Sequence, residues 1–201
     1  MKIKLGIMGF GSIGRKLYSE SLKCDNIEIV AISDIGDPNI LLYLLKNEFK
    51  NTENASFENN YLSIDNNRCY FLNAINSGDV PWDLFDIDFV IDATGKFNTL
   101  EHMRKHLDAG AKRVIISSLP VESIDRLVVY GVNEDTIQLQ DRTISAGSST
   151  MNALALLIKT FLPFGIDSVN MTTIHSYTSD QSLQDVVGSD FRCSRSASEN
   201  I

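Results

Sequence analysis

Residues 3–14, Ile3-Lys4-Leu5-Gly6-Ile7-Met8-Gly9-Phe10-Gly11-Ser12-Ile13-Gly14, decide the fold class of this chain. The apolar run before Gly9 predicts a short buried strand, and a helical pattern follows the glycines as far as Leu22. A second apolar run, Ile27 to Ile32, leads to Asp34, about twenty residues after the glycine loop. This order of strand, glycine loop, helix, strand and acidic residue predicts a parallel βαβ unit.

The rest of the chain continues the alternation of strands and helices. We expect further helices over Asn39 to Leu45, from the capping box at Asn98 to Asp108, and from Ser148-Ser149 to Leu162. Further strands are expected at Arg68 to Leu72, Phe89 to Ala93, Arg113 to Ser117, Leu127 to Gly131 and Ser168 to His175. The asparagine-rich residues 51–60 are expected to form an exposed excursion. The pattern predicts an α/β fold with a doubly wound, Rossmann-type domain over 1–148 and the start of a second, α+β domain over 149–201.

Composition and charge limit the partners. The chain has 201 residues, of which 43% are hydrophobic, and a formal net charge of −8. This charge, with no stripe dense in Lys and Arg, argues against nucleic acid or an anionic membrane as partner. A small phosphorylated ligand remains compatible, because backbone amides and a few arginines can bind it locally.

The cysteines and the N-terminus indicate the compartment. Cys24, Cys69 and Cys193 are few and widely spaced, so we expect reduced thiols and neither a disulfide framework nor a metal site. Glycine interrupts the first residues too soon for a signal-peptide core, and no apolar run reaches membrane length. We therefore expect a cytoplasmic protein.

The glycine loop indicates a dinucleotide site. Gly9 permits a tight turn, Gly11 lets the backbone approach a pyrophosphate, and Gly14 allows the helix to pack closely on the strand. Asp34 would accept hydrogen bonds from an adenosine ribose and repel a 2′-phosphate, which favours NAD over NADP. A purely structural turn, with Asp34 as a solvated cap, is the alternative.

Other polar residues are ambiguous when taken singly. His102 and His106 lie one helical turn apart in a charged helix, so we expect both on the surface. Ser149 alone could be a plain helix cap, and His175 alone could be a satisfied core histidine at a strand end.

Several stretches together resemble one enzyme family, the phosphorylating glyceraldehyde-3-phosphate dehydrogenases of the bacterial type. They run in order along the whole chain: Gly6 to Arg15, Ser33 to Pro38, Asp92 to Phe97, Gly110 to Ser117, Tyr130 to Asn133 and Thr172 to Thr178. The resemblance implies NAD as cofactor. In this family Ser12 and Ile13 would face the pyrophosphate, Asp34 the ribose, and Thr94, Gly95 and Ser117 the rest of the cofactor cleft. Phe10 belongs to the same loop.

The resemblance also implies a catalytic site. Position 149, held here by serine, corresponds to the nucleophilic cysteine, and His175 to the general base and acid. Ser148, Thr150, Thr178 and Arg195 would bind phosphate groups of a phosphorylated aldehyde and of inorganic phosphate. In such enzymes a thiolate adds to the aldehyde, hydride passes to NAD, and phosphate releases an acyl phosphate.

Ser149 and the chain length alter what this resemblance implies. A hydroxyl is a far weaker acid than a thiol, so we expect a loss of roughly 10³- to 10⁶-fold in catalysis, with binding largely kept. The chain ends in the family's interface loop, before the rest of the catalytic-domain sheet, so we expect a fragment or a chain completed by a partner. A complete chain is expected to form a homotetramer.

Three alternatives stay open at this point. The first is a non-catalytic NAD-binding or regulatory homologue in which Ser149 is native. The second is a working enzyme whose cysteine was replaced by serine. The third keeps the chemistry but changes the substrate to erythrose 4-phosphate.

Overall fold

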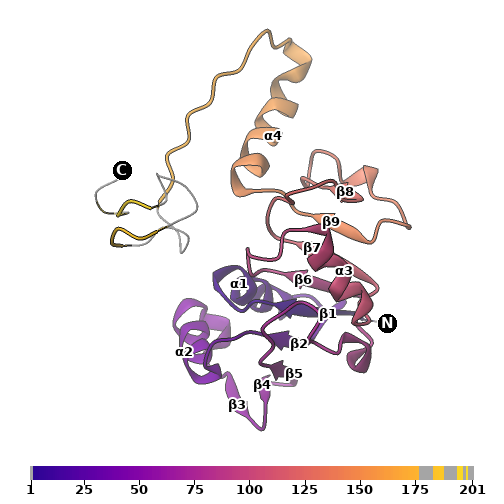
Figure 1. Cartoon of the computed structure of the whole chain (residues 1–201), viewed down its shortest axis with the longest axis vertical. Coiled ribbons are helices and arrows are strands. Elements are labelled where there is room, and N and C mark those ends of the chain that lie inside the picture. Colours follow the sequence, from indigo (N-terminus) through magenta and orange to yellow (C-terminus); the bar gives the residue numbers. More distant parts are fainter. Residues whose placement is uncertain (1, 177–182, 188–193, 197, 199–201) are drawn as a thin grey trace. The chain divides into compact units, whose positions relative to one another are not determined.

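The computed structural model describes residues 2–176, 183–187, 194–196 and 198 (Figure 1). The chain divides into two compact units, Met1–Pro163 and Phe164–Ile201.

The first unit is built on one sheet. Its described strands follow the order β3-β4-β5-β2-β1-β6-β7-β9-β8. Their bounds are β1 Ile3–Met8, β2 Ile27–Ser33, β3 Ser56–Glu58, β4 Tyr61–Ile64, β5 Asn67–Leu72, β6 Phe89–Asp92, β7 Arg113–Ile116, β8 Arg126–Leu127 and β9 Thr143–Ser145. All neighbours from β5 to β8 pair in parallel, whereas β3, β4 and β5 pair antiparallel.

The helices follow the strands closely along the chain. The α-helices are α1 Ser12–Ser21, α2 Pro38–Glu48, α3 Leu100–Asp108 and α4 Ser149–Phe161. Short 3₁₀ turns are η1 Lys50–Thr52, η2 Trp82–Phe85, η3 Glu134–Thr136 and η4 Leu162–Phe164. No helix in the described part of the chain combines the length and the apolar character needed to cross a membrane.

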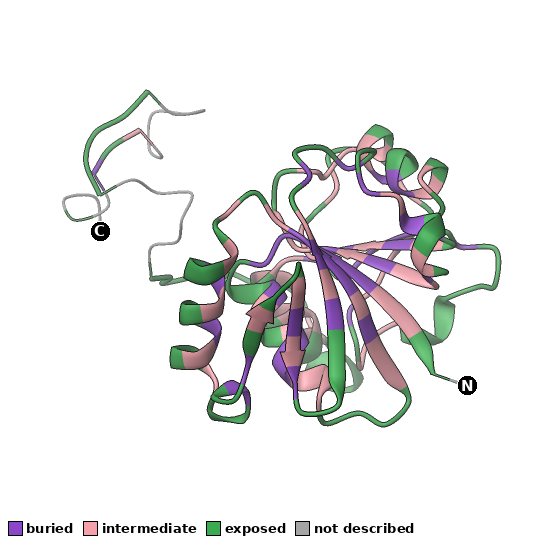
Figure 2. Ribbon diagram, turned by 90° about the horizontal axis from the view of Figure 1, so that it is seen from below, coloured by how far each residue is buried: buried purple, intermediate pink, exposed green. Residues whose placement is uncertain are grey.

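Two core clusters cover the opposite faces of the sheet. Successive strand residues point to opposite faces, and in β1 Ile7 and Met8 belong to different clusters. The Ile7 cluster includes Tyr18 of α1 and Leu45 of α2, whereas the Met8 cluster includes Met103 of α3. Figure 2 shows the buried residues concentrated along the central strands. This arrangement confirms the doubly wound, Rossmann-type prediction.

The strand order creates a crevice beside β1. The chain passes from β1 to β2 on one side of it, and β6 joins it on the other side. Ligands of open parallel sheets bind where the strand order reverses, outside the carboxyl ends of the strands. The glycine loop that follows β1 therefore lies at the expected binding edge.

One predicted strand is much shorter than expected. We predicted a strand over Leu127 to Gly131, but β8 covers only Arg126–Leu127. The side chain of Asn133 accepts a hydrogen bond from Val129 N at 2.8 Å and donates one to Leu127 O at 2.9 Å. These bonds replace a strand partner and turn the chain away from the sheet.

The predicted strand over Ser168 to His175 is also wrong. Residues 168–176 carry no regular secondary structure, and none of them pairs with another strand in the part that the structure describes. A strand needs a ladder partner, because its backbone groups cannot satisfy one another within the segment.

The predicted excursion over residues 51–60 is more ordered than expected. It contains η1 and β3, and β3 forms a hairpin with β4. Thr52 is fully buried, and its hydroxyl is within hydrogen-bond distance of Leu45 O and Phe49 O. The buried threonine thereby fastens this segment to the end of α2.

Candidate cofactor site

Two glycines of the loop lie so close to neighbouring backbone that a side chain there would clash. Gly9 has a φ of +90°, and a Cβ built on it would lie 2.8 Å from Thr94 N. A Cβ on Gly14 would overlap Gly9 O, so α1 packs directly against the loop. A Cβ on Gly11 would meet nothing within 4 Å, which leaves open space beside its backbone. Gly9 and Gly14 therefore serve the fold, and Gly11 leaves room for a ligand.

Helix α1 presents an uncapped N-terminus at this open space. Gly11 is the N-cap residue, and no side chain caps the first turn. Gly11, Ser12 and Ile13 are exposed. The N–H groups of a first turn and the positive end of the helix dipole attract anions. This geometry fits a pyrophosphate.

Asp34 joins the glycine loop to the end of β2. Its Oδ2 accepts a hydrogen bond from Phe10 N at 2.6 Å, and its Oδ1 accepts one from Gly36 N at 2.7 Å. The two amides orient the carboxylate, and each oxygen keeps a further lone pair for a ribose hydroxyl. The Phe10 ring is buried and packs edge-on against Tyr18, so Phe10 can face a ligand only through its backbone.

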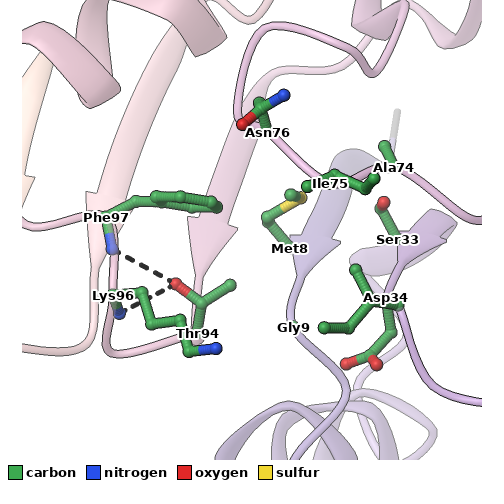
Figure 3. Close-up of a pocket in the computed structure, with 11 residues that line it drawn as sticks. Met8, Gly9, Ser33, Asp34, Ala74, Ile75, Asn76, Thr94, Lys96 and Phe97 are labelled. Carbon is green, nitrogen blue, oxygen red and sulfur yellow. Dashed lines mark hydrogen bonds between the residues drawn. The ribbon is translucent and has the colours of Figure 1, made fainter.

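A cavity of about 370 Å³ lies beside Asp34 (Figure 3). It is bounded by the carboxyl ends of β1 and β2 and by the segments that follow β5 and β6. Its lining residues are Met8, Gly9, Ser33, Asp34, Ile35, Ala74, Ile75, Asn76, Thr94, Lys96 and Phe97. Among the predicted cofactor residues, the structure thus brings Gly9, Asp34 and Thr94 to one cavity.

Ser33 contributes a buried polar atom to this cavity. Ser33 is fully buried, and its hydroxyl has no hydrogen-bond partner among the described residues. A buried hydroxyl without a partner is costly unless a ligand or water satisfies it. Together with the space beside Gly11 and the acceptors of Asp34, this hydroxyl shows that the residues present fit an adenine dinucleotide.

The far wall of the cavity is the loop after β6. Thr94 Oγ1 accepts hydrogen bonds from Lys96 N at 3.1 Å and Phe97 N at 3.4 Å (Figure 3). Gly95 has a φ of +69° within this tight turn. Ser117 does not line the cavity, but its N–H donates to Asp92 O at 2.9 Å, which places it next to the start of the loop.

Behind this loop lies a buried hydrogen-bonded network that the sequence did not predict. Asp92 Oδ1 accepts from Thr94 N at 2.9 Å and from Thr94 Oγ1 at 2.6 Å. The other carboxylate oxygen lies 3.2 Å from His106 Nε2, and Trp82 Nε1 donates to His106 Nδ1 at 3.0 Å. His106 is only 1% exposed, so the predicted surface position is wrong. It lies three residues after Met103, on the buried face of α3.

The Ser149 region is organised by a capped helix start. Ser148 is the N-cap of α4, and its hydroxyl accepts a hydrogen bond from Met151 N at 3.1 Å. Ser149, the first residue of α4, is exposed, and Thr150 follows it in the first turn. The Asn152 amide donates to Ala146 O and Ser148 O and so fixes the turn before the helix. Ser149 therefore lies at the positive end of a helix dipole.

The remaining predicted residues belong to the second unit. His175 is exposed, and its Nδ1 lies 2.6 Å from Ser176 O. Arg195 forms an ion pair with Asp185 at 3.3 Å. Thr178 lies outside the described residues. Ser149 belongs to the first unit and His175 to the second, so the pairing of the two stays a prediction.

Two protein-family models match the chain in order. The model described as the glyceraldehyde 3-phosphate dehydrogenase NAD binding domain matches residues 3–100. The model described as the glyceraldehyde 3-phosphate dehydrogenase C-terminal domain matches residues 148–201. NAD is therefore the cofactor of the domain family to which the first match belongs.

Curated relatives extend this similarity over almost the whole chain. A glyceraldehyde-3-phosphate dehydrogenase of Mycoplasma pneumoniae is 41% identical over 205 residues, which cover 99% of this chain and 60% of the relative. Those of Priestia megaterium and Thermotoga maritima are 38% and 37% identical, over 100% and 98% of this chain and 61% of each relative. The chain thus spans about three fifths of the length of these relatives. Both domain models and these relatives show that the chain belongs to the glyceraldehyde-3-phosphate dehydrogenase family.

Proposed function

We propose that this chain binds NAD in the cavity beside Asp34. The pyrophosphate lies against the first turn of α1 at Ser12 and Ile13, and the adenosine ribose is held by the Asp34 carboxylate. Thr94 lines the same cavity, and Gly95 and Ser117, which lie outside its lining, are assigned to the rest of the cofactor cleft from the resemblance to the family. The observation that carries this proposal is the position of Asp34, which contacts the glycine loop and lines the cavity at the same time.

The proposed reaction is the NAD-dependent, phosphate-dependent oxidation of glyceraldehyde 3-phosphate. Bound NAD supplies the hydride acceptor. The residues proposed to bind phosphate groups are Ser148 and Thr150 at the start of α4, with Thr178 and Arg195 from the second unit. Membership in the family and the anion-attracting N-terminus of α4 support this substrate class.

Position 149 is proposed as the site of nucleophilic attack. A thiol there would be favoured as thiolate by the helix N-terminus, and His175 would hold the proton that leaves it. The serine present in this chain keeps the position and the hydrogen-bonding capacity. Its hydroxyl ionises far less readily, so the chain binds its ligands better than it turns them over.

The assembly and the location of the protein are also proposals. We place the boundary between the NAD-binding and catalytic domains at residues 148 and 149, where α4 begins after β9. Family membership supports a homo-oligomer, a homotetramer for a full-length chain. The free thiols Cys24 and Cys69 support a reducing compartment such as the cytoplasm.

The activity is tested by comparing this chain with Ser149→Cys, both alone and extended by the remaining C-terminal sequence of a relative. NADH formation is followed with glyceraldehyde 3-phosphate or erythrose 4-phosphate, each with and without inorganic phosphate. We expect phosphate-dependent activity with glyceraldehyde 3-phosphate in the extended cysteine variant. A preference for erythrose 4-phosphate would change the substrate, and activity in neither cysteine form would remove the catalytic assignment.

Ser149 itself favours a second candidate, a non-catalytic NAD-binding homologue. A serine at the first position of α4 is a good residue for a helix start and a poor nucleophile. In that case NAD binds to this chain, and cysteine at position 149 brings no activity even in the extended chain.

A further inference from the structure

A directed chain of hydrogen bonds runs from the core to the cofactor cavity. The indole N–H of Trp82 can only donate, so His106 Nδ1 must accept and carries no proton. The ring proton of the neutral imidazole then lies on Nε2 and points to Asp92 Oδ2. Trp82 thus fixes the tautomer of His106, and His106 donates to the carboxylate.

At its other end, this series of hydrogen bonds shapes the wall of the cavity. The Thr94 hydroxyl donates a hydrogen bond to Asp92 Oδ1, so the lone pairs of Thr94 Oγ1 remain to accept hydrogen bonds from the N–H groups of Lys96 and Phe97. All three of these loop residues line the cavity. The conformation of the wall therefore depends on which way the Thr94 hydroxyl points, and Asp92 sets that direction.

We propose that His106 is a positioning residue for cofactor binding, which acts through Asp92 and Thr94 on the loop of residues 94–97. The inference rests on the proposed binding of NAD in this cavity. His106 does not line the cavity, and the hydrogen bonds through Asp92 connect it to Thr94, which does. Because a ligand binds only the competent fraction of loop conformations, a loosened loop lowers its apparent affinity in proportion.

The network has the burial that makes such a role effective. Trp82, His106 and Asp92 are 0%, 1% and 2% exposed, so water cannot replace a lost partner cheaply. The backbone of Asp92 is held independently, by its register in β6 and by the N–H of Ser117. Loss of the His106 contact therefore changes the position of the Asp92 side chain and of Thr94, and leaves strand β6 in place.

Two substitutions of His106 separate positioning from packing. In His106→Gln the amide nitrogen takes the place of Nε2 and still donates to Asp92, while the contact with Trp82 is lost. In His106→Asn the amide oxygen takes the place of Nδ1 and still accepts from Trp82, while the contact with Asp92 is lost. Both variants remove the ring, and asparagine is one methylene shorter than glutamine, so its loss of core packing is the larger of the two.

The readout is the dissociation constant for NAD from titration calorimetry, with thermal unfolding followed in parallel. At a temperature where both variants are fully folded, we expect His106→Gln to bind NAD within about twofold of the wild type and His106→Asn to bind it about tenfold more weakly. Equal NAD affinities of the two variants would overturn the positioning role and leave NAD binding itself intact. A folded wild-type chain that does not bind NAD would overturn both.

A second pair of variants tests the same role if His106→Asn fails to fold. In Asp92→Asn the amide oxygen is needed to accept from Thr94 N, so the amide N–H₂ faces the proton on His106 Nε2. Two donors then face each other. Adding Trp82→Phe frees Nδ1 to carry the proton, so that Nε2 can accept from the introduced amide. We expect the double variant to bind NAD several-fold better than Asp92→Asn alone, although it removes more of the core. Additive losses of affinity would overturn the proposal.

Discussion

Asp34 at the end of β2 accepts a hydrogen bond from the backbone N–H of Phe10 at 2.6 Å. Its second oxygen accepts from Gly36 N at 2.7 Å. One carboxylate thus connects the loop after β1 with the turn after β2 by hydrogen bonds, and the same residue lines the cavity. Any change of this side chain therefore acts on the loop and on the proposed ribose site together.

We predict that Asp34→Asn destabilises the chain and weakens its preference for NAD over NADP. An amide offers one acceptor oxygen, so one of the two backbone N–H groups loses its partner, at a cost of about 1–2 kcal/mol. Loss of the negative charge also removes the repulsion of a 2′-phosphate. Urea unfolding measures the first effect, and titrations with NAD and NADP measure the second. An unchanged ratio of the two affinities would show that Asp34 does not face the ribose.

Substitutions at two glycines of the loop are predicted to act differently, one on the stability of the fold and the other on NAD binding. Gly14→Ala forces a methyl group against Gly9 O, so we expect a loss of at least about 2 kcal/mol in unfolding free energy. Gly11→Ala meets open space in an extended backbone, so its stability changes by less than about 0.5 kcal/mol.

Gly11→Ala is nevertheless expected to weaken NAD binding by about tenfold, because its methyl group occupies the approach of the pyrophosphate. Thermal unfolding and titration calorimetry on both variants check this contrast. Unweakened NAD binding by Gly11→Ala would place the pyrophosphate elsewhere.

Ser149→Cys is predicted to create a thiol more reactive than Cys24. Both positions are exposed, but only position 149 lies at the N-terminus of a long helix, which favours the thiolate. Alkylation by iodoacetamide at pH 7, followed by peptide mass spectrometry, gives both rates in one sample. Equal rates would mean that the α4 terminus does not activate this position, and the expected catalytic gain of roughly 10³- to 10⁶-fold would lose its basis.

Burial of Cys69 predicts a loss of stability at alkaline pH. Desolvation raises the pKa of this thiol well above its ordinary value, and the charge of Glu28 adds to the shift. The folded chain therefore keeps a proton that the unfolded chain releases above pH of about 8.5. Protons bound by the folded state exceed those bound by the unfolded state in that range, so stability falls as pH rises.

The test is the urea midpoint, followed by the fluorescence of Trp82 between pH 7 and pH 9.5. Cys69→Ala lowers the midpoint at every pH because it leaves a small cavity, but its midpoint changes less with pH. Parallel pH profiles of the wild type and the variant would rule out Cys69 as the source.

The first βαβ unit could be predicted from sequence because its signals are local. The apolar runs of β1 and β2, the glycines between them and Asp34 lie within one short stretch, and each has a direct structural meaning. The start of α3 was also signalled locally, but its cap is Thr99 and not the predicted Asn98, because the Thr99 hydroxyl accepts from His102 N and the helix begins at Leu100.

The opposite wall of the cavity could not be predicted in the same way. Ala74, Ile75 and Asn76 follow β5, and Phe97 follows β6. These segments meet the glycine loop only because β1 lies between β2 and β6, and strand order is not written in any local pattern. Ser33 begins one of the stretches that resemble the family, but no local pattern indicated that its hydroxyl would be buried without a partner among the described residues.

His106 shows how a charged neighbourhood can mislead. Its helix is rich in basic residues, yet the spacing from Met103 to His106 places both on one face. That spacing was the available signal. Ser168 to His175 had the composition of a strand, but a strand forms only where a partner offers its backbone groups.

The most direct test is titration calorimetry of NAD into the folded wild-type chain, with Gly11→Ala as the matched variant. We predict saturable binding at one site per chain and about tenfold weaker binding by Gly11→Ala. A folded wild-type chain that shows no saturable NAD binding would contradict the assignment of the cavity beside Asp34.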